Sequence, residues 1–200
     1  MILNFPYYIS LNFIKKKYSG IGLEVTASTG IASVNIGGST IYSWAGIGLG
    51  NLPAQQIIEN LFSARGSKAR HRIKKTKILA IDEISMISAN LLELLDIVFK
   101  AVRNSNLPMG GMQVLFFGDF LQLPPVNKGV EEVSFCFSSS VWKELNLSNI
   151  ILKQIFRQQD MKFIKNFPSY TINEEAGYGN DYFVDKKEEK TQCYYFKIFI

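Results

Sequence analysis

Ile81-Asp82-Glu83-Ile84-Ser85-Met86 decides the fold of this chain, together with Gly118-Asp119-Phe120-Leu121-Gln122-Leu123-Pro124-Pro125-Val126 further along. An apolar run precedes each stretch, Ile78 to Ile81 in the first case and Val114 to Phe117 in the second. Short continuous apolar runs are typical of strands buried in a parallel sheet, and the ligands of such sheets bind at the carboxyl ends of the strands. The two stretches therefore predict an α/β fold with a polar site at one edge of the sheet.

The side chains at these strand ends suit the hydrolysis of nucleoside triphosphates. In such enzymes the first acid, here Asp82, holds Mg²⁺ on the phosphates, and the second, Glu83, can polarise the attacking water. Gln122 follows in a loop that Pro124 and Pro125 stiffen. An isolated Asp-Glu pair would equally suit an ordinary exposed strand end, but both stretches in this order are far more specific.

Together the two stretches resemble motifs II and III of superfamily-one DNA helicases, in particular the petite integration frequency (Pif) family. The resemblance extends to Val25–Ala32, which is similar to that family's motif Ia, and to Ile36–Gly48, Phe135–Phe137 with Trp142, and Leu152–Asp160. It implies a RecA-like P-loop NTPase fold with a mostly parallel, doubly wound sheet. Residues 1–166 would form a partial RecA-like helicase motor domain, and residues 167–200 a divergent tail that we expect to be poorly ordered.

The resemblance also implies roles for single residues in ATP hydrolysis. Asp82 would be the Mg²⁺ ligand and Glu83 the general base, while Gln122 would sense the γ-phosphate. Arg157 would reach the γ-phosphate as an arginine finger does; a surface ion pair with Asp160 is the alternative. The implied cofactors are ATP and Mg²⁺.

The implied partner is single-stranded DNA. The candidate contacts are hydroxyls and amides of the motif Ia segment and one aromatic ring, namely Thr26, Ser28, Thr29, Gly30 and Tyr42. A helix N-cap is the structural alternative for the hydroxyls, and buried packing is the alternative for Tyr42 and for Trp44.

The phosphate-binding loop of this fold is not found in the sequence. That loop reads Gly-x-x-x-x-Gly-Lys-Ser/Thr, and no Gly-Lys pair occurs among the 200 residues. The resemblance places the loop at or before Met1, so we expect an N-terminally truncated motor domain. Loss of the lysine charge near a phosphate would alone cost about 4 kcal/mol at an effective dielectric constant near 20. We therefore expect the isolated chain to be inactive as an ATPase.

Composition narrows the remaining possibilities. Two cysteines and one histidine exclude a disulfide framework and a four-ligand Cys/His zinc site within the chain. The absence of long apolar stretches predicts no membrane association, and we expect an intracellular monomer, in the nucleus or the mitochondrion if the source is eukaryotic. Arg65–Lys77 holds seven Lys or Arg residues and no acid. This run suits either a phosphate backbone or a solvated loop.

Helices and strands alternate along the predicted domain, which favours a doubly wound sheet. We expect strands at 23–26, 78–81 and 114–117, helices at 8–18, 28–35 and 53–63, and a loop through the basic run. A longer helix should begin after Ser88 as its cap, since Leu91, Leu95, Val98 and Val102 repeat with helical spacing.

The leading hypothesis is thus an ATP-dependent DNA helicase of the Pif type, a family with roles in repair, recombination and telomere maintenance. The alternatives are a catalytically dead remnant that binds DNA or a partner, and a RecD-like superfamily-one motor. The long match through Gly38–Gly50 argues against the RecD-like motor.

Overall fold

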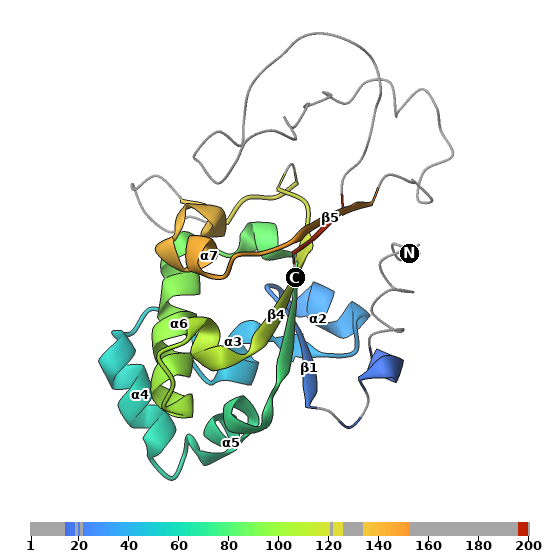
Figure 1. Ribbon diagram of the computed structural model, residues 1–200. Helices are drawn as coiled ribbons and strands as arrows, with labels where there is room; N and C mark the ends of the chain where they lie inside the picture. The colour runs from blue at the N-terminus through green and yellow to red at the C-terminus, as the bar shows by residue number, and fades with distance from the viewer. Residues whose placement is uncertain are drawn as a thin grey trace, which may run out of the picture.

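The structure is a computed structural model that describes residues 15–18, 20, 22–120, 122–125, 134–152 and 196–199. Its centre is a sheet in the order β2-β1-β3-β4-β6-β5 (Figure 1). The strands are β1 (Leu23–Ala27), β2 (Ser39–Thr40), β3 (Ile78–Asp82), β4 (Gln113–Gly118), β5 (Asn149–Leu152) and β6 (Phe196–Phe199). β1 to β4 pair in parallel, and only β6 runs antiparallel to its neighbours. The predicted α/β fold with a mostly parallel sheet is confirmed.

Side chains alternate between the two faces of the sheet and build two separate cores. Leu79, Ile81 and Phe116 face the larger core, which α3 to α7 cover, while Ala80 and Phe117 face a smaller core beside α2. The helices are α2 (Gly30–Asn35), α3 (Ile41–Ala45), α4 (Ala54–Phe62), α5 (Ser67–Lys75), α6 (Ala89–Arg103) and α7 (Ser140–Glu144). Within the described residues, no helix is long and apolar enough to cross a membrane.

The longest helix, α6, matches the sequence prediction in both its cap and its buried face. The Ser88 hydroxyl accepts a hydrogen bond from the Leu91 N–H at 3.2 Å, and Leu92, Leu95, Val98 and Phe99 are fully buried. Asn104 ends the helix in the left-handed conformation, which asparagine tolerates better than most residues. α6 thereby supplies the rigid support on which β3 and β4 lie.

The basic run does not form the loop that we predicted. It folds into α5, because Ala69 and Ile73 lie four residues apart and both are buried. Arg70 donates to the carbonyls of Leu61 and Phe62 at the end of α4, at 3.2 and 2.8 Å. Arg72 donates to Ser43 O at 3.1 Å and to Trp44 O at 2.8 Å. Half-buried arginines, and not a flexible loop, therefore fix this segment.

The sheet also contains a strand from the predicted tail. Phe196–Phe199 forms β6, in which Lys197 pairs with Gly118 of β4 and with Ile151 of β5. β6 lies between β4 and β5 in the sheet, while the domain boundary at residue 166 and the poor order of the tail stay predictions. The rest of residues 167–195 lies outside the described residues.

Candidate nucleotide and DNA site

The carboxyl ends of β1, β3 and β4 meet at one edge of the sheet. Ala27 is in register with Asp82, and Ile81 is in register with Phe116. The Ser28 N–H then donates to Asp82 O at 3.0 Å, which extends the pairing of β1 and β3 beyond the strand. This register brings the motif Ia segment and the two acids of motif II together, as we expected from the strand ends.

Motif II leaves the sheet through a strained residue. Glu83 has φ 53° and ψ 49°, a left-handed conformation that is uncommon for residues other than glycine. Its N–H donates to Asp82 Oδ1 at 2.8 Å, so the backbone of one acid orients the carboxylate of the other. Asp82 is 7% exposed, whereas Glu83 is partly exposed. Strain of this kind concentrates at functional sites.

Gly118 holds motif III against motif II. A Cβ atom at this position would lie 2.9 Å from the Ile84 nitrogen and 3.0 Å from Ile84 Cγ2. The residue also has φ +156°, which disfavours any side chain. Glycine is therefore required here because the backbone of β4 passes directly beside the turn that follows Glu83.

Beyond Gly118, Asp119 orients Gln122. The Gln122 N–H donates to Asp119 O at 3.1 Å, and its side-chain Nε2 donates to Asp119 Oδ2 at 3.3 Å. Asp119 thus both accepts the backbone hydrogen bond of the turn and orients the Gln122 amide. The Gln122 side chain is exposed, where it can reach a ligand at the sheet edge.

A cluster of aromatic side chains packs against Phe120 in this loop. Phe120 packs edge-to-face against Phe135, Phe137 and Trp142, with ring centroids 4.9–5.9 Å apart. Cys136, which follows Phe135 in the sequence, is fully buried, and its Sγ lies 3.6 Å from Ile84 O. Burial raises the pKa of the Cys136 thiol far above its ordinary value. The segment 135–142, which we matched to the Pif family by sequence, therefore packs against motif III through Phe120 and against motif II through Ile84.

The residues present fit the protein's share of a Mg²⁺ site. The described residues contain no group of three or more acidic, His or Cys side chains that could hold a metal by themselves. Mg²⁺ bound to nucleotide typically uses one or two carboxylates, several waters and phosphate oxygens, so a single acid such as Asp82 suffices. Nearby, the buried hydroxyls of Ser28 and Ser85 have no hydrogen-bond partner within the described residues. Such orphaned groups at the sheet edge suit a bound ligand or water.

The motif Ia residues divide into two groups. Thr26 is fully buried and its hydroxyl donates to Ala80 O at 2.9 Å, so its side chain has no surface with which to contact DNA. Thr29 caps α2, since its Oγ1 accepts from Ala32 N–H at 3.2 Å, yet it remains partly exposed beside the exposed Gly30. Thr29 and Gly30 keep their candidate role, together with the Ser28 hydroxyl, and Thr26 loses it.

The two aromatic candidates also separate. Trp44 is 2% exposed and packs edge-to-face on Phe99, so it belongs to the core. Tyr42 is half-buried, and burial raises the pKa of its hydroxyl. It lines a hollow of about 550 Å³ with Thr40, Ser43, Gly46, Gly48 and Leu49. Tyr42 can therefore present its ring to a base, whereas Trp44 cannot.

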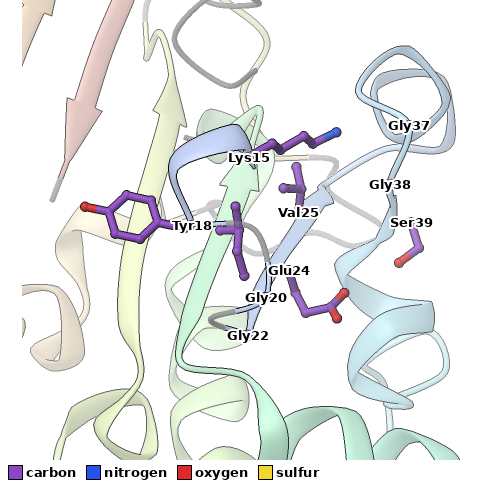
Figure 2. A pocket seen from close by; sticks show the side chains of 10 residues that line it. Lys15, Tyr18, Gly20, Gly22, Glu24, Val25, Gly37, Gly38 and Ser39 are labelled. Carbon is purple, nitrogen blue, oxygen red and sulfur yellow. The ribbon is translucent and has the colours of Figure 1, made fainter. Parts of the chain in front are cut away.

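Two further features complete the inventory of the site. Arg157, the candidate arginine finger, lies outside the described residues. A second hollow of about 450 Å³ follows the outer edge of β1 beyond the short strand β2 (Figure 2). There Lys15 reaches across to donate to Ile36 O at 2.5 Å, above Val25 and Gly38. This hollow is built from the side of β1, apart from the acids of motif II.

Comparison with known proteins gives the site a context. Residues 8–174 match the family described as PIF1-like helicase. The chain is 45% identical over 149 residues to ATP-dependent DNA helicase RRM3 of Saccharomyces cerevisiae, with 74% of this chain and 20% of the relative covered. It is 47% identical over 153 residues to ATP-dependent DNA helicase PIF1 of Candida albicans, with 72% and 17% covered. The chain thus spans about a fifth of the length of these relatives.

Solved structures agree in fold. The crystal structure of Pif1 helicase from Candida albicans superposes with a TM-score of 0.73 at 44% identity, over 81% of this chain and 36% of that one. Bacteroides Pif1 bound to ssDNA and Bacteroides Pif1 in complex with ADP-AlF4 superpose with TM-scores of 0.62 and 0.61, each at 34% identity over 79% of this chain and 38% of theirs. Because the match covers most of the sequence, and the motifs meet at one sheet edge, the chain belongs to the PIF1-like helicase family.

Proposed function

We propose that this chain is the part of an ATP-dependent DNA helicase motor that supplies metal ligation, water activation and one portion of the single-stranded DNA track. The observation that carries the proposal is the convergence of Asp82, Glu83, Gln122 and Ser28 at the carboxyl edge of β1, β3 and β4. An intracellular monomer, in the nucleus or mitochondrion of a eukaryote, is part of the same proposal.

Each residue at this edge has a role that its geometry supports. Asp82 would hold Mg²⁺, which supplies charge stabilisation to the phosphates when bound. Glu83, whose backbone is fixed on the Asp82 carboxylate, would accept the proton of the attacking water. Gln122, oriented by Asp119, would hydrogen-bond to the nucleotide and transmit its state to the DNA side of the domain. Arg157 would contribute positive charge to the γ-phosphate.

The phosphate cradle is the part of the mechanism that these 200 residues do not contain. No Gly-Lys pair occurs in the sequence, so neither the wrapping amides nor the lysine charge of such a loop is available. The purified chain should accordingly hydrolyse ATP no faster than its Glu83→Gln variant, with or without DNA. A DNA-stimulated activity that Glu83→Gln abolishes would contradict this expectation.

A second candidate function is that of a catalytically inactive domain that binds DNA or a partner. A chain of this kind would keep the motif Ia surface and lose any need for the strained Glu83. The two candidates differ in whether Asp82 and Glu83 support ATP hydrolysis when a phosphate-binding loop is provided.

Single-stranded DNA binding is supported by the exposed Thr29–Gly30 segment and by the Tyr42 hollow. A matched pair of variants tests this role. Thr29→Ala and Ser88→Ala each remove a hydroxyl that accepts from an N–H at 3.2 Å at a helix N-cap. Each should cost about 1 kcal/mol of stability, but only Thr29→Ala should weaken the binding of a labelled oligothymidylate. Equal binding by the two variants would leave Thr29 as a cap and nothing more.

A further inference from the structure

The helix α5 carries exposed lysines whose side chains make no hydrogen bond or ion pair to the rest of the described residues. Its inner side is fixed by Ala69 and Ile73, and its two arginines donate to carbonyls of α3 and α4. From α6, Arg103 donates to the carbonyls of Ile73, Lys74 and Thr76. What remains on the outer side is a row of exposed lysines, Lys68, Lys74 and Lys75, with the exposed Arg65 and Lys77 just beyond the two ends of the helix.

These outer cations form no ion pair within the described residues. No acid occurs between Arg65 and Lys77, and the ion pairs found among the described residues involve Lys100 alone. The row spans about 10 Å between Lys68 and Lys75 at the helical rise of 1.5 Å per residue. A rigid row of unpaired cations of this length can contact successive phosphates of a nucleic acid backbone.

The row lies at the opposite end of the sheet from the proposed single-strand site. α5 leads into the amino end of β3, where the Lys77 N–H donates to Gly22 O, whereas Ser28 and Asp82 meet at its carboxyl end (Figure 1). Lys77, directly before β3, and Asp82, at its carboxyl end, are separated by about 16 Å along the strand, at a rise of 3.3 Å per residue. The basic helix and the motif Ia segment therefore form separate surfaces.

The chemistry of the exposed face selects its partner. Surfaces that bind single strands combine cations with aromatic rings on which bases stack. The outer side of α5 has no Phe, Tyr or Trp, and the one ring exposed on it is the imidazole of His71. The nearby Phe62 is 51% exposed, but the Arg70 guanidinium lies over its ring at 5.3 Å from the centroid. A lipid surface would need apolar side chains to insert, and the apolar residues of α5 are buried. Contacts to phosphates alone suit an intact duplex.

We propose that the outer face of α5 is a second DNA-contacting surface, which binds the phosphate backbone of double-stranded DNA apart from the single-strand site. It extends the proposed function to a further partner, but it does not depend on nucleotide binding or on the motif Ia segment. Binding should be independent of sequence and micromolar or weaker at physiological salt, as is usual for purely electrostatic contacts.

The test compares two triple variants of the whole chain that remove equal charge. Lys68→Gln, Lys74→Gln and Lys75→Gln neutralise the α5 row, while Lys16→Gln, Lys17→Gln and Lys143→Gln neutralise exposed lysines elsewhere. Glutamine is as good a helix former as lysine, and thermal unfolding checks that both variants fold. Fluorescence anisotropy then measures the affinity for a labelled hairpin duplex and for oligothymidylate between 50 and 200 mM KCl.

The salt slope is the slope of log affinity against log salt concentration, and the loss of three phosphate contacts should reduce its magnitude by about 2.7. When the salt is raised fourfold, the wild type should therefore lose about 40-fold more duplex affinity than the α5 variant does. The control variant should keep the wild-type slope, and oligothymidylate binding should not distinguish the two variants. The proposal is overturned if both variants flatten the duplex slope equally, if the wild type does not bind duplex, or if the α5 variant loses affinity only for an acidic peptide or anionic vesicles. Thr29→Ala reports on the single-strand site separately, so either proposal can fail alone.

Discussion

Gly118→Ala is the substitution that most directly probes the contact between motifs II and III. The added methyl group would lie 2.9 Å from the Ile84 nitrogen, a separation that Cβ atoms essentially never show, and 3.0 Å from Ile84 Cγ2, which is tighter than most Cβ contacts. Neither neighbour is the free end of a flexible side chain, because Ile84 is fully buried and its backbone follows the strained Glu83. The end of β4 or the motif II turn must therefore move.

The magnitude follows from the cost of overpacking. Forced insertion of one methyl group into a well-packed region costs about 1–3 kcal/mol, and each kcal/mol lowers the midpoint of thermal unfolding by about 2–4 °C in a chain of this size. We expect Gly118→Ala to lower the midpoint by about 2–12 °C, as measured by circular dichroism. Movement of the end of β4 should also break the 3.3 Å hydrogen bond between the Gln122 and Asp119 side chains.

Gly30→Ala is the matched control for this change. A Cβ atom at Gly30 would meet nothing within 4 Å, and the residue lies in the first turn of α2. Alanine is the better helix former by about 1 kcal/mol, so the control should be neutral or slightly stabilising. If Gly118→Ala unfolds at the same temperature as the wild type, the close approach of β4 to the motif II turn is not real and our account of the site geometry fails.

Four other predictions concern the backbone strain at Glu83, the hydrogen bonds of Arg103, and the reactivity and pKa of the buried Cys136 thiol. Glu83→Gly should be more stable than Glu83→Ala by about 0.5–1 kcal/mol in chemical denaturation, since glycine relieves the left-handed strain; the reverse order would contradict the strained conformation. Arg103→Lys should lose about 1.5–3 kcal/mol, because one ammonium group cannot replace a guanidinium that donates to four carbonyls, and an unchanged denaturation midpoint would refute this role. In a Cys193→Ser background, the buried Cys136 thiol should react with a thiol reagent only as fast as the protein opens, and rapid labelling in native buffer would show that it is accessible. Because burial raises the pKa of Cys136, its contribution to stability should be complete below about pH 8.5 and should fall as the pH rises further, which urea titrations at several pH values would detect.

Much of the sheet edge could be predicted from the sequence because it depends on local patterns. The apolar runs before Asp82 and Gly118 define buried strands, and parallel strands bring their carboxyl ends together. The helical spacing from Leu91 to Val102 defines the buried face of α6. Such features need no knowledge of distant contacts.

Other features depend on contacts that no local pattern contains. α5 was missed because seven charges conceal one apolar pair, Ala69 and Ile73, whose four-residue spacing was the available signal. The internal roles of Arg70 and Arg72 require the positions of carbonyls in α3 and α4. β6 pairs with strands far away in the sequence, and the left-handed Glu83 lies beside Gly118, which comes from a different strand.

The central claim is that Asp82 and Glu83 form the working half of an ATPase site that needs only a phosphate cradle. The direct test replaces the matching segment of the Candida albicans helicase with residues 22–166 of this chain, so that the host supplies its own phosphate-binding loop and the remaining domains. Because general bases contribute about 100-fold or more, the chimera should show DNA-stimulated ATP hydrolysis that Glu83→Gln reduces by at least that factor, while Glu59→Gln, an exposed glutamate on α4, leaves it unchanged. A folded chimera that binds nucleotide and DNA but does not hydrolyse ATP, or one that Glu83→Gln leaves active, would contradict the account and favour an inactive binding domain.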